Sequence, residues 1–246
     1  MIRRPPRSTL SSSSAASDVY KRQSFYWKGE YKNDFNTRVT HVTHLNALEF
    51  YKPSLNKSSI NFDLVMLGNL DPVIQMDIYS QVKSDNNFVI LDTMNYWIEK
   101  TQKELFEIIC KVNLVVINDE ESKMLGKSES IEECAKNILS CGPDYIIIKK
   151  GSHGAELFSK HQRSAIPALD NIKVVDPTGA GDSFVGGVCG YLGLQPMISF
   201  KEIHNAMIYG AVIASFCIEE FGLARLQKIS KENIDKRIKT FAKQLL

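Results

Sequence analysis

The chain has 246 residues, enough for one α/β domain with a sizeable core, and its 43% hydrophobic and 24% charged residues are ordinary for a globular protein. No apolar run is long enough to cross a bilayer, so we expect no membrane partner. The formal net charge of +2 is too small to indicate nucleic-acid binding.

The cysteines indicate a reducing compartment. There are five, an odd number with no CxxC pair, and several lie in apolar helical patterns: Cys110, Cys134, Cys141, Cys189 and Cys217. This usage is typical of reduced core residues, and we therefore expect a cytoplasmic protein.

Residues 1–23 differ in composition from the rest of the chain. They are rich in Arg and Ser, contain Pro5-Pro6 and have no apolar centre, which excludes a secretory signal peptide. Their five basic residues and one acidic residue leave the remainder with a formal charge of −2. The segment resembles translated sequencing-adapter sequence more than a transit peptide. We predict that it is disordered, non-native and without a function.

Residues 24–50 are predicted to form part of a small β lid. Aromatic and polar residues alternate here, as in half-buried strands. The polar cluster at 34–38 is either a hairpin turn or part of a site for a polyhydroxylated ligand, which Asn36 and Arg38 would then contact. His41 and His44 are three residues apart, so on a strand they would face opposite sides, and no further ligand completes a zinc site.

From residue 51 to residue 246, strands and helices alternate. Asp71 and Pro72 have the residue types of a helix cap and first turn. Continuous apolar strands alternating with helices indicate a mostly parallel sheet covered on both faces, a three-layer α/β fold. The predicted strands are 62–67, 88–91, 114–117, 145–148, 155–158 and 163–168. The predicted helices after the one at Pro72 are 98–110, 131–139, 180–192, 202–219 and 234–246.

Polar residues follow three successive predicted strands. In parallel sheets the ligand lies beyond the carboxyl ends of the strands, which favours a shared site there. The alternative is that these residues only cap the helices that follow. The pairs are Asn69 and Asp71, Asp92 and Asn95, and Asn118 and Glu121.

The most specific stretch is residues 174–184, Val-Val-Asp-Pro-Thr-Gly-Ala-Gly-Asp-Ser-Phe. A short β-branched strand is expected to end at Pro177, and Gly179 and Gly181 allow backbone geometry that side chains forbid. A helix that begins directly after such a turn presents unpaired N–H groups and a positive dipole end, which together form an anion cradle. An acid beside phosphate is repelled, so we expect Asp182 to accept a proton from an attacking hydroxyl. The alternative is an ordinary strand-to-helix turn capped by Asp182.

The turn at 149–154 joins two predicted strands. It is either a simple hairpin or a place where Gly151 and Gly154 let the backbone lie close to a nucleotide. His153 is predicted to be exposed and not catalytic. The chain has no P-loop, no complete dinucleotide fingerprint and no GxSxG elbow. What remains is an anion cradle, an adjacent carboxylate and a metal-binding carboxylate at Glu121. These are the groups that an active site needs for phosphoryl transfer to a hydroxyl.

Three motifs together resemble one family. Residues 176–184 are similar to the C-terminal signature of the ribokinase-like, phosphofructokinase-B family of sugar and nucleoside kinases. Asn118-Asp119-Glu120-Glu121 resembles that family's NxxE motif, and residues 150–154 resemble its nucleotide loop. The resemblance covers roughly residues 24–246 and implies the ribokinase-like fold.

The resemblance also implies roles for individual residues. Asp182 would be the base, and the amides around Gly179, Ala180 and Gly181 would stabilise the transferring phosphoryl group. Mg²⁺ would be bound, largely through water, by Asn118 and Glu121, and K⁺ would be bordered by Asp176 and Thr178. ATP would be contacted by Lys150, Gly151, Gly154 and Asn205. The sugar or nucleoside would be contacted by Asn36, Arg38, Asn69, Asp71 and Asn95.

The chain departs from the family at its front. The glycine-rich sugar-binding motif and first strands of the family have no counterpart, so we expect a truncated chain with an unpaired sheet edge and exposed apolar surface. A homodimer through the lid is expected for the full-length protein. The alternatives to a kinase are a non-catalytic ATP- or sugar-binding regulator on the same fold and an NAD-dependent oxidoreductase.

Overall fold

A computed structural model describes residues 23–31, 38–55, 62–82, 84 and 86–245. The chain divides into two compact units, one up to Pro53 and one from Ser54, which are described separately. In the first, β1 (Tyr26–Tyr31) pairs antiparallel with β2 (Arg38–His44), and a 3₁₀ turn, η1 (Asn46–Phe50), follows. The strands expected in this small sheet are therefore confirmed.

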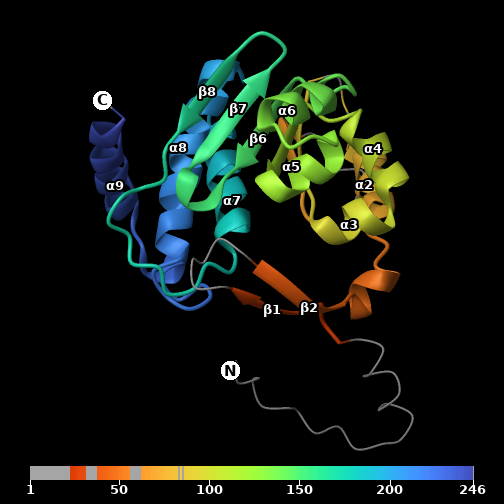
Figure 1. The fold of residues 1–246 in the computed structure, drawn as a ribbon, viewed down its shortest axis with the longest axis horizontal. Coiled ribbons are helices and arrows are strands. Elements are labelled where there is room, and N and C mark those ends of the chain that lie inside the picture. Colours follow the sequence, from red (N-terminus) through yellow and green to blue (C-terminus); the bar gives the residue numbers. More distant parts are fainter. Residues whose placement is uncertain (1–22, 32–37, 56–61, 83, 85, 246) are drawn as a thin grey trace, which may run out of the picture. The chain divides into compact units, whose positions relative to one another are not determined.

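The second unit contains a six-stranded sheet in the order β3-β4-β5-β6-β7-β8. Strands β6, β7 and β8 are labelled in Figure 1. Neighbouring strands from β3 to β6 are parallel, and β7 and β8 continue the sheet antiparallel. The prediction of a mostly parallel sheet is confirmed. The strands are β3 (Leu64–Leu67), β4 (Phe88–Asp92), β5 (Leu114–Asn118), β6 (Tyr145–Lys149), β7 (Ala155–Ser159) and β8 (Arg163–Ile166).

The helices largely follow the predicted positions, except that α5 was not predicted as a helix. They are α2 (Pro72–Val82), α3 (Asn95–Lys100), α4 (Gln102–Ile109), α5 (Asp119–Gly126), α6 (Ile131–Leu139), α7 (Ala180–Leu192), α8 (Phe200–Cys217) and α9 (Lys231–Gln244), with short 3₁₀ turns η3 (Gly151–His153) and η4 (Leu226–Lys228).

One helix prediction is wrong. The single helix expected over 98–110 is two helices, because the backbone at Thr101 leaves the helical region, with φ −135° and ψ 44°. No helix in the described part of the chain is long and apolar enough to span a membrane.

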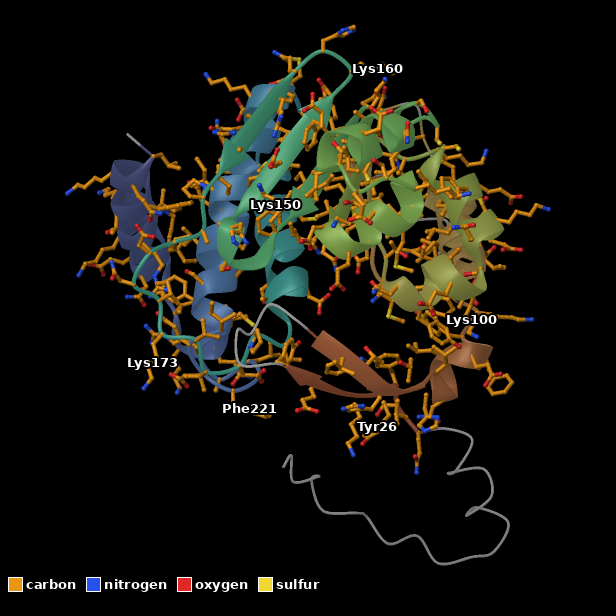
Figure 2. All side chains as sticks on the ribbon, viewed as in Figure 1. Tyr26, Lys100, Lys150, Lys160, Lys173 and Phe221 are labelled. Atoms are coloured by element: carbon orange, nitrogen blue, oxygen red, sulfur yellow. The ribbon has the colours of Figure 1, made fainter. Side chains whose placement is uncertain are left out.

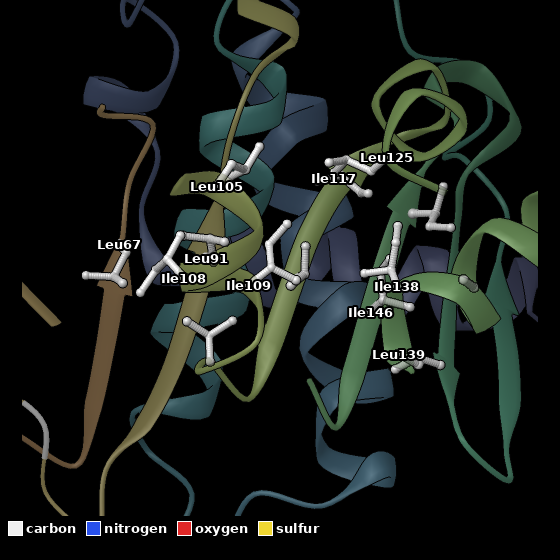
Figure 3. Close-up of a cluster of buried hydrophobic side chains, with 14 of the residues drawn as sticks. Leu67, Leu91, Leu105, Ile108, Ile109, Ile117, Leu125, Ile138, Leu139 and Ile146 are labelled. Carbon is white, nitrogen blue, oxygen red and sulfur yellow. The ribbon is translucent and has the colours of Figure 1, made fainter. Parts of the chain in front are cut away.

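Alternating strand residues build a core on each face of the sheet. Leu91, Ile117 and Ile146 pack against side chains of α2, α4, α5 and α6 (Figure 3). Ile90 and Ile147 point the other way, into a core formed with α7, α8 and α9. The period-2 side-chain alternation of the strands therefore produces the three expected layers.

Strand β3 lies at the end of the described sheet. Phe62, just before it, and Met66 within it are 42% and 37% exposed. Both observations agree with the expected edge and exposed apolar surface. The cysteine prediction is only partly right: all five are free thiols, but Cys134 and Cys217 are buried whereas Cys110 is exposed at the end of α4.

Candidate functional site

The segment before α7 is a loop, and the short strand expected at Val174 and Val175 is absent from it. The Val175 and Asp176 amides both donate to the Ile218 carbonyl, at 2.8 and 3.3 Å. Two β-branched residues before a proline are too few to compete with this acceptor at the end of α8. The loop is therefore fixed to the end of α8 rather than paired in the sheet.

The turn that enters α7 is held by local contacts. Asp176 Oδ1 accepts the Thr178 amide at 2.9 Å, and the Cys217 thiol donates to the Thr178 carbonyl at 3.7 Å. Gly179, the N-cap, has φ +83°, a left-handed conformation that strains any residue with a side chain. Gly179 therefore sets the direction in which α7 begins.

The first turn of α7 presents N–H groups that the helix cannot use. Ser183 N makes the first helical bond, to Gly179 O at 2.9 Å, and Ala180 N bends back to Pro177 O at 3.1 Å. The Gly181 and Asp182 amides have no carbonyl of their own helix within reach. Asp182 is exposed in this first turn. The alternative that Asp182 merely caps the helix is wrong, because Gly179 occupies the N-cap.

A lysine that the motif comparison overlooked lies at this turn. Lys149, at the end of β6, places its Nζ 3.7 Å from Asp92 Oδ1 at the end of β4. The same Nζ would lie 3.3 Å from a Cβ added at Gly181. The carboxyl ends of two strands and the first turn of α7 thus converge, as expected for an open parallel sheet.

The surroundings of Asp92 disfavour the charged form of its carboxylate. Burial raises its pKa, the nearby Lys149 ammonium lowers it, and Asp182 raises it further, with a net rise. On α7, the pKa of Cys189 is raised to about 11, first by burial and then by the charge of Asp92. Asp92 is therefore electrostatically coupled to both Asp182 and the interior face of α7.

Four buried oxygen atoms, in α2, at the end of β4 and at the start of α3, have no hydrogen-bond partner among the described residues. They are Gln75 Oε1, Asp92 Oδ1, Thr93 Oγ1 and Asn95 Oδ1. Gln75 Nε2 donates to the Gly68 and Asp92 carbonyls. These two bonds fix the orientation of the amide, and its oxygen faces no hydrogen-bond donor of the described residues. Buried acceptors without donors are costly and often mark a place where water or a ligand binds.

Asn118 and Glu121 form a capping box at the start of α5. Asn118 Oδ1 accepts the Glu121 amide and Glu121 Oε2 accepts the Asn118 amide, each at 2.8 Å. Asn118 is aligned with Lys149 across the β5–β6 pair. The capping interpretation is confirmed for this pair, and Glu121 is buried.

The turn after β6 begins beyond Lys150 (Figure 2) and is a short 3₁₀ segment. His153 within it is exposed, as expected. Gly154 has φ +85°, and an added Cβ there would collide with the Ile166 carbonyl. Packing against the end of β8 therefore suffices to require this glycine. Lys150 forms a close ion pair with Glu156 of β7, which also accepts Arg163 Nε at 2.9 Å.

Replacing Glu156 with Gln is expected to destabilise the protein by about 1–3 kcal/mol at pH 7, because Lys150 and Arg163 lose a charged acceptor. Burial raises the Glu156 pKa, but hydrogen bonds from Lys150 and Arg163 outweigh it and the pKa is lowered. A lowered folded-state pKa gives stability that is present above the unfolded pKa and lost as the pH falls through the folded one. Urea unfolding at pH 7 and pH 3 measures this. An equal difference between the two proteins at both pH values would contradict it.

The remaining predicted residues are placed as follows. Asn69 Oδ1 accepts Trp97 Nε1 at 3.0 Å, and Asp71 Oδ1 caps α2 through the Val73 amide at 2.8 Å. Asn205 of α8 lies near the Tyr191 hydroxyl, at the C-terminal end of α7. Arg38 begins β2 in the other compact unit, and Asn36 lies outside the described residues.

Comparisons with known proteins agree with the fold. Residues 49–229 match the pfkB family carbohydrate kinases. The nucleoside kinase of Methanocaldococcus jannaschii is 28% identical over 178 residues, which cover 72% of this chain and 55% of that protein. The cytidine kinase of Thermococcus kodakarensis is 33% identical over 102 residues, 40% of this chain and 36% of that protein. The chain thus spans about half the length, or less, of these curated relatives.

Solved structures show the same fold at low identity. A Burkholderia thailandensis nucleoside kinase in complex with inosine has a TM-score of 0.70 at 20% identity, covering 88% of this chain and 69% of that one. A ribokinase from Thermotoga maritima has a TM-score of 0.66 at 22% identity, covering 87% and 69%. The fold is therefore ribokinase-like, and the match over residues 49–229 shows that the chain belongs to the pfkB family of carbohydrate kinases.

Proposed function

We propose that the protein transfers the terminal phosphoryl group of ATP to a hydroxyl group of a sugar or nucleoside. The observation that carries this proposal is the first turn of α7, where an exposed Asp182 carboxylate lies beside amides that their own helix cannot satisfy. The matched relatives are kinases of nucleosides and sugars, which supports this class of acceptor.

Asp182 acts as the general base in this proposal. Its carboxylate accepts the hydroxyl proton as the hydroxyl oxygen attacks phosphorus, and the bond from phosphorus to the ADP oxygen breaks. The Gly181 and Asp182 amides, with the turn through Gly179 and Ala180, form the anion hole for the oxygens of the phosphoryl group. The positive end of α7 favours the same charge.

The strand ends fit a magnesium ion. Mg²⁺ prefers oxygen ligands and keeps several of its waters, and the side chains of Glu121 and Asn118 carry oxygen atoms of this kind. Bound there, the ion would neutralise phosphate charge. Among the described residues, no three His, Cys, Asp or Glu side chains form a metal cluster. Asp176 and Thr178 are proposed to border K⁺.

Lys150, Gly151, Gly154 and Asn205 are proposed to lie along the nucleotide. Asn205 lies near Tyr191, nine residues from Asp182 along α7 and so on the order of 14 Å away along the helix axis. Asn69, Asp71 and Asn95 follow the strands at the same edge and are proposed to contact the acceptor. A homodimer through the lid and a cytoplasmic location stay predictions.

The test is a turnover assay with ATP, Mg²⁺ and a panel of sugars and nucleosides, run beside calorimetry with ATP and with NAD. The expected result is formation of ADP that requires one class of acceptor. Binding of ATP and acceptor without turnover would favour the non-catalytic regulator, and binding of NAD would favour the oxidoreductase.

Replacing Glu121 with Gln is expected to raise the Mg²⁺ concentration needed for half-maximal turnover by roughly tenfold or more, because outer-shell partners carry much of a metal site's affinity. Gln keeps an acceptor for the Asn118 amide, so the helix cap is retained. A magnesium titration of both proteins measures this. An unchanged requirement would remove Glu121 from the metal site.

A further inference from the structure

The proposed site contains an ammonium group that its neighbouring carboxylate satisfies poorly. Lys149 Nζ is 3.7 Å from Asp92 Oδ1, beyond hydrogen-bond length, and this oxygen accepts no hydrogen bond from the described residues. Both side chains are nevertheless largely buried, at 17% and 6% exposed. A buried ion pair offsets the cost of desolvation only when its geometry is good. Structural pairing alone therefore accounts poorly for Lys149.

Strand β6 is able to pair a lysine well. Lys150 directly follows the strand and makes a close contact with Glu156, whose pKa is held down by this contact and by Arg163. Asp92, in contrast, has a raised pKa beside Lys149. The loose pairing is thus specific to the lysine that faces α7.

Lys149 also lies beside a second positive charge, the N-terminal end of α7. Its Nζ lies over the first turn of α7, 3.3 Å from the place of a Cβ on Gly181. A helix N-terminus carries a partial positive charge, so an ammonium placed there is repelled. An anion between the ammonium and the Gly181 and Asp182 amides would convert this repulsion into two attractions.

We propose that Lys149 is a catalytic residue whose ammonium contacts the phosphoryl group that is transferred, and that Asp92 is a positioning residue that holds Lys149 while this group is absent. The inference rests on the proposed function and adds a cation to its anion hole. Lys149 gains and loses no proton: it stabilises charge on the phosphoryl oxygens, while Asp182 takes the hydroxyl proton.

The experiment compares Lys149→Met, Asp92→Asn and the double variant with the unaltered chain, with Lys173→Met on the exposed surface as the control. Calorimetry measures affinity for a non-hydrolysable ATP analogue, for ADP and for adenosine, and thermal unfolding reports stability. Lys149→Met alone leaves Asp92 as an unpaired buried charge and can destabilise the fold for that reason. The double variant removes both charges and separates folding from phosphate binding.

In the double variant we expect stability to recover while affinity for the ATP analogue stays about 10- to 100-fold below that of the unaltered chain, as for a lost charged hydrogen bond. The affinity of the double variant for ADP should fall less, and its affinity for adenosine should not change. Lys173→Met should bind all three ligands as the unaltered chain does. Recovery of analogue affinity in the double variant, or an equal loss for adenosine, would overturn the role of Lys149. Failure of the unaltered chain to bind the analogue would instead overturn the proposed function on which this role rests.

Discussion

Replacing Asp182 with Asn is expected to lower turnover by roughly 10²- to 10⁴-fold, the usual contribution of a general base. The amide of Asn has nearly the same shape but does not accept the hydroxyl proton. Because Asp182 is an exposed residue in the first turn of α7, the substitution should leave the fold intact. Steady-state kinetics with saturating ATP and acceptor, with thermal unfolding of both proteins, measures the effect.

A matched control is Asp235→Asn on α9. It makes the same chemical change at a carboxylate whose contact is an exposed ion pair with Lys231, 2.8 Å away. Its turnover should equal that of the unaltered chain, because exposed pairs contribute little. Near-normal turnover of Asp182→Asn would contradict the assignment of the base.

Replacing Gly187 with Ala is expected to destabilise the protein by about 1–3 kcal/mol, the usual cost of overpacking a core. An added Cβ would lie 2.8 Å from Gly210 Cα and 3.0 Å from the Tyr209 carbonyl, both backbone atoms of α8. Helices α7 and α8 would have to separate, and the N-terminal turn of α7 is linked to α8 through Thr178 and Cys217. Turnover should therefore fall together with the melting temperature.

The neighbouring glycine provides the control. A Cβ at Gly186 would meet nothing within 4 Å, so Gly186→Ala should be neutral or stabilise the helix by up to about 1 kcal/mol. Thermal unfolding of the two variants side by side tests the packing. Equal melting temperatures for Gly187→Ala and Gly186→Ala would contradict the prediction, because the close contact of Gly187 with α8 would then not affect stability.

Much of the fold followed from the sequence pattern. The buried parallel strands are continuous apolar runs because both faces of the sheet are covered, and α6 and α7 begin and end at the predicted residues. The turn into α7 was predictable from its glycines, because a residue without a Cβ is favoured where the chain adopts a left-handed conformation. Gly179 has that conformation.

Other features depended on tertiary contacts that a sequence pattern does not contain. The Val175 amide donates a hydrogen bond to the carbonyl of Ile218, 43 positions later in the chain. Lys149 and Lys150 are adjacent, and side-chain alternation along a strand indicates only that they face opposite sides. The structure distinguishes them, because Asp92 and Gly181 lie beside Lys149 whereas Glu156 lies beside Lys150.

The measurement that tests the central claim most directly is detection of the phosphorylated acceptor by mass spectrometry after incubation with ATP and Mg²⁺, for the unaltered chain and for Asp182→Asn. We predict a product with one added phosphoryl group for at least one sugar or nucleoside, formed in step with ADP and nearly abolished by Asp182→Asn. Release of ADP without any phosphorylated acceptor, or equal product from both proteins, would contradict phosphoryl transfer at the first turn of α7.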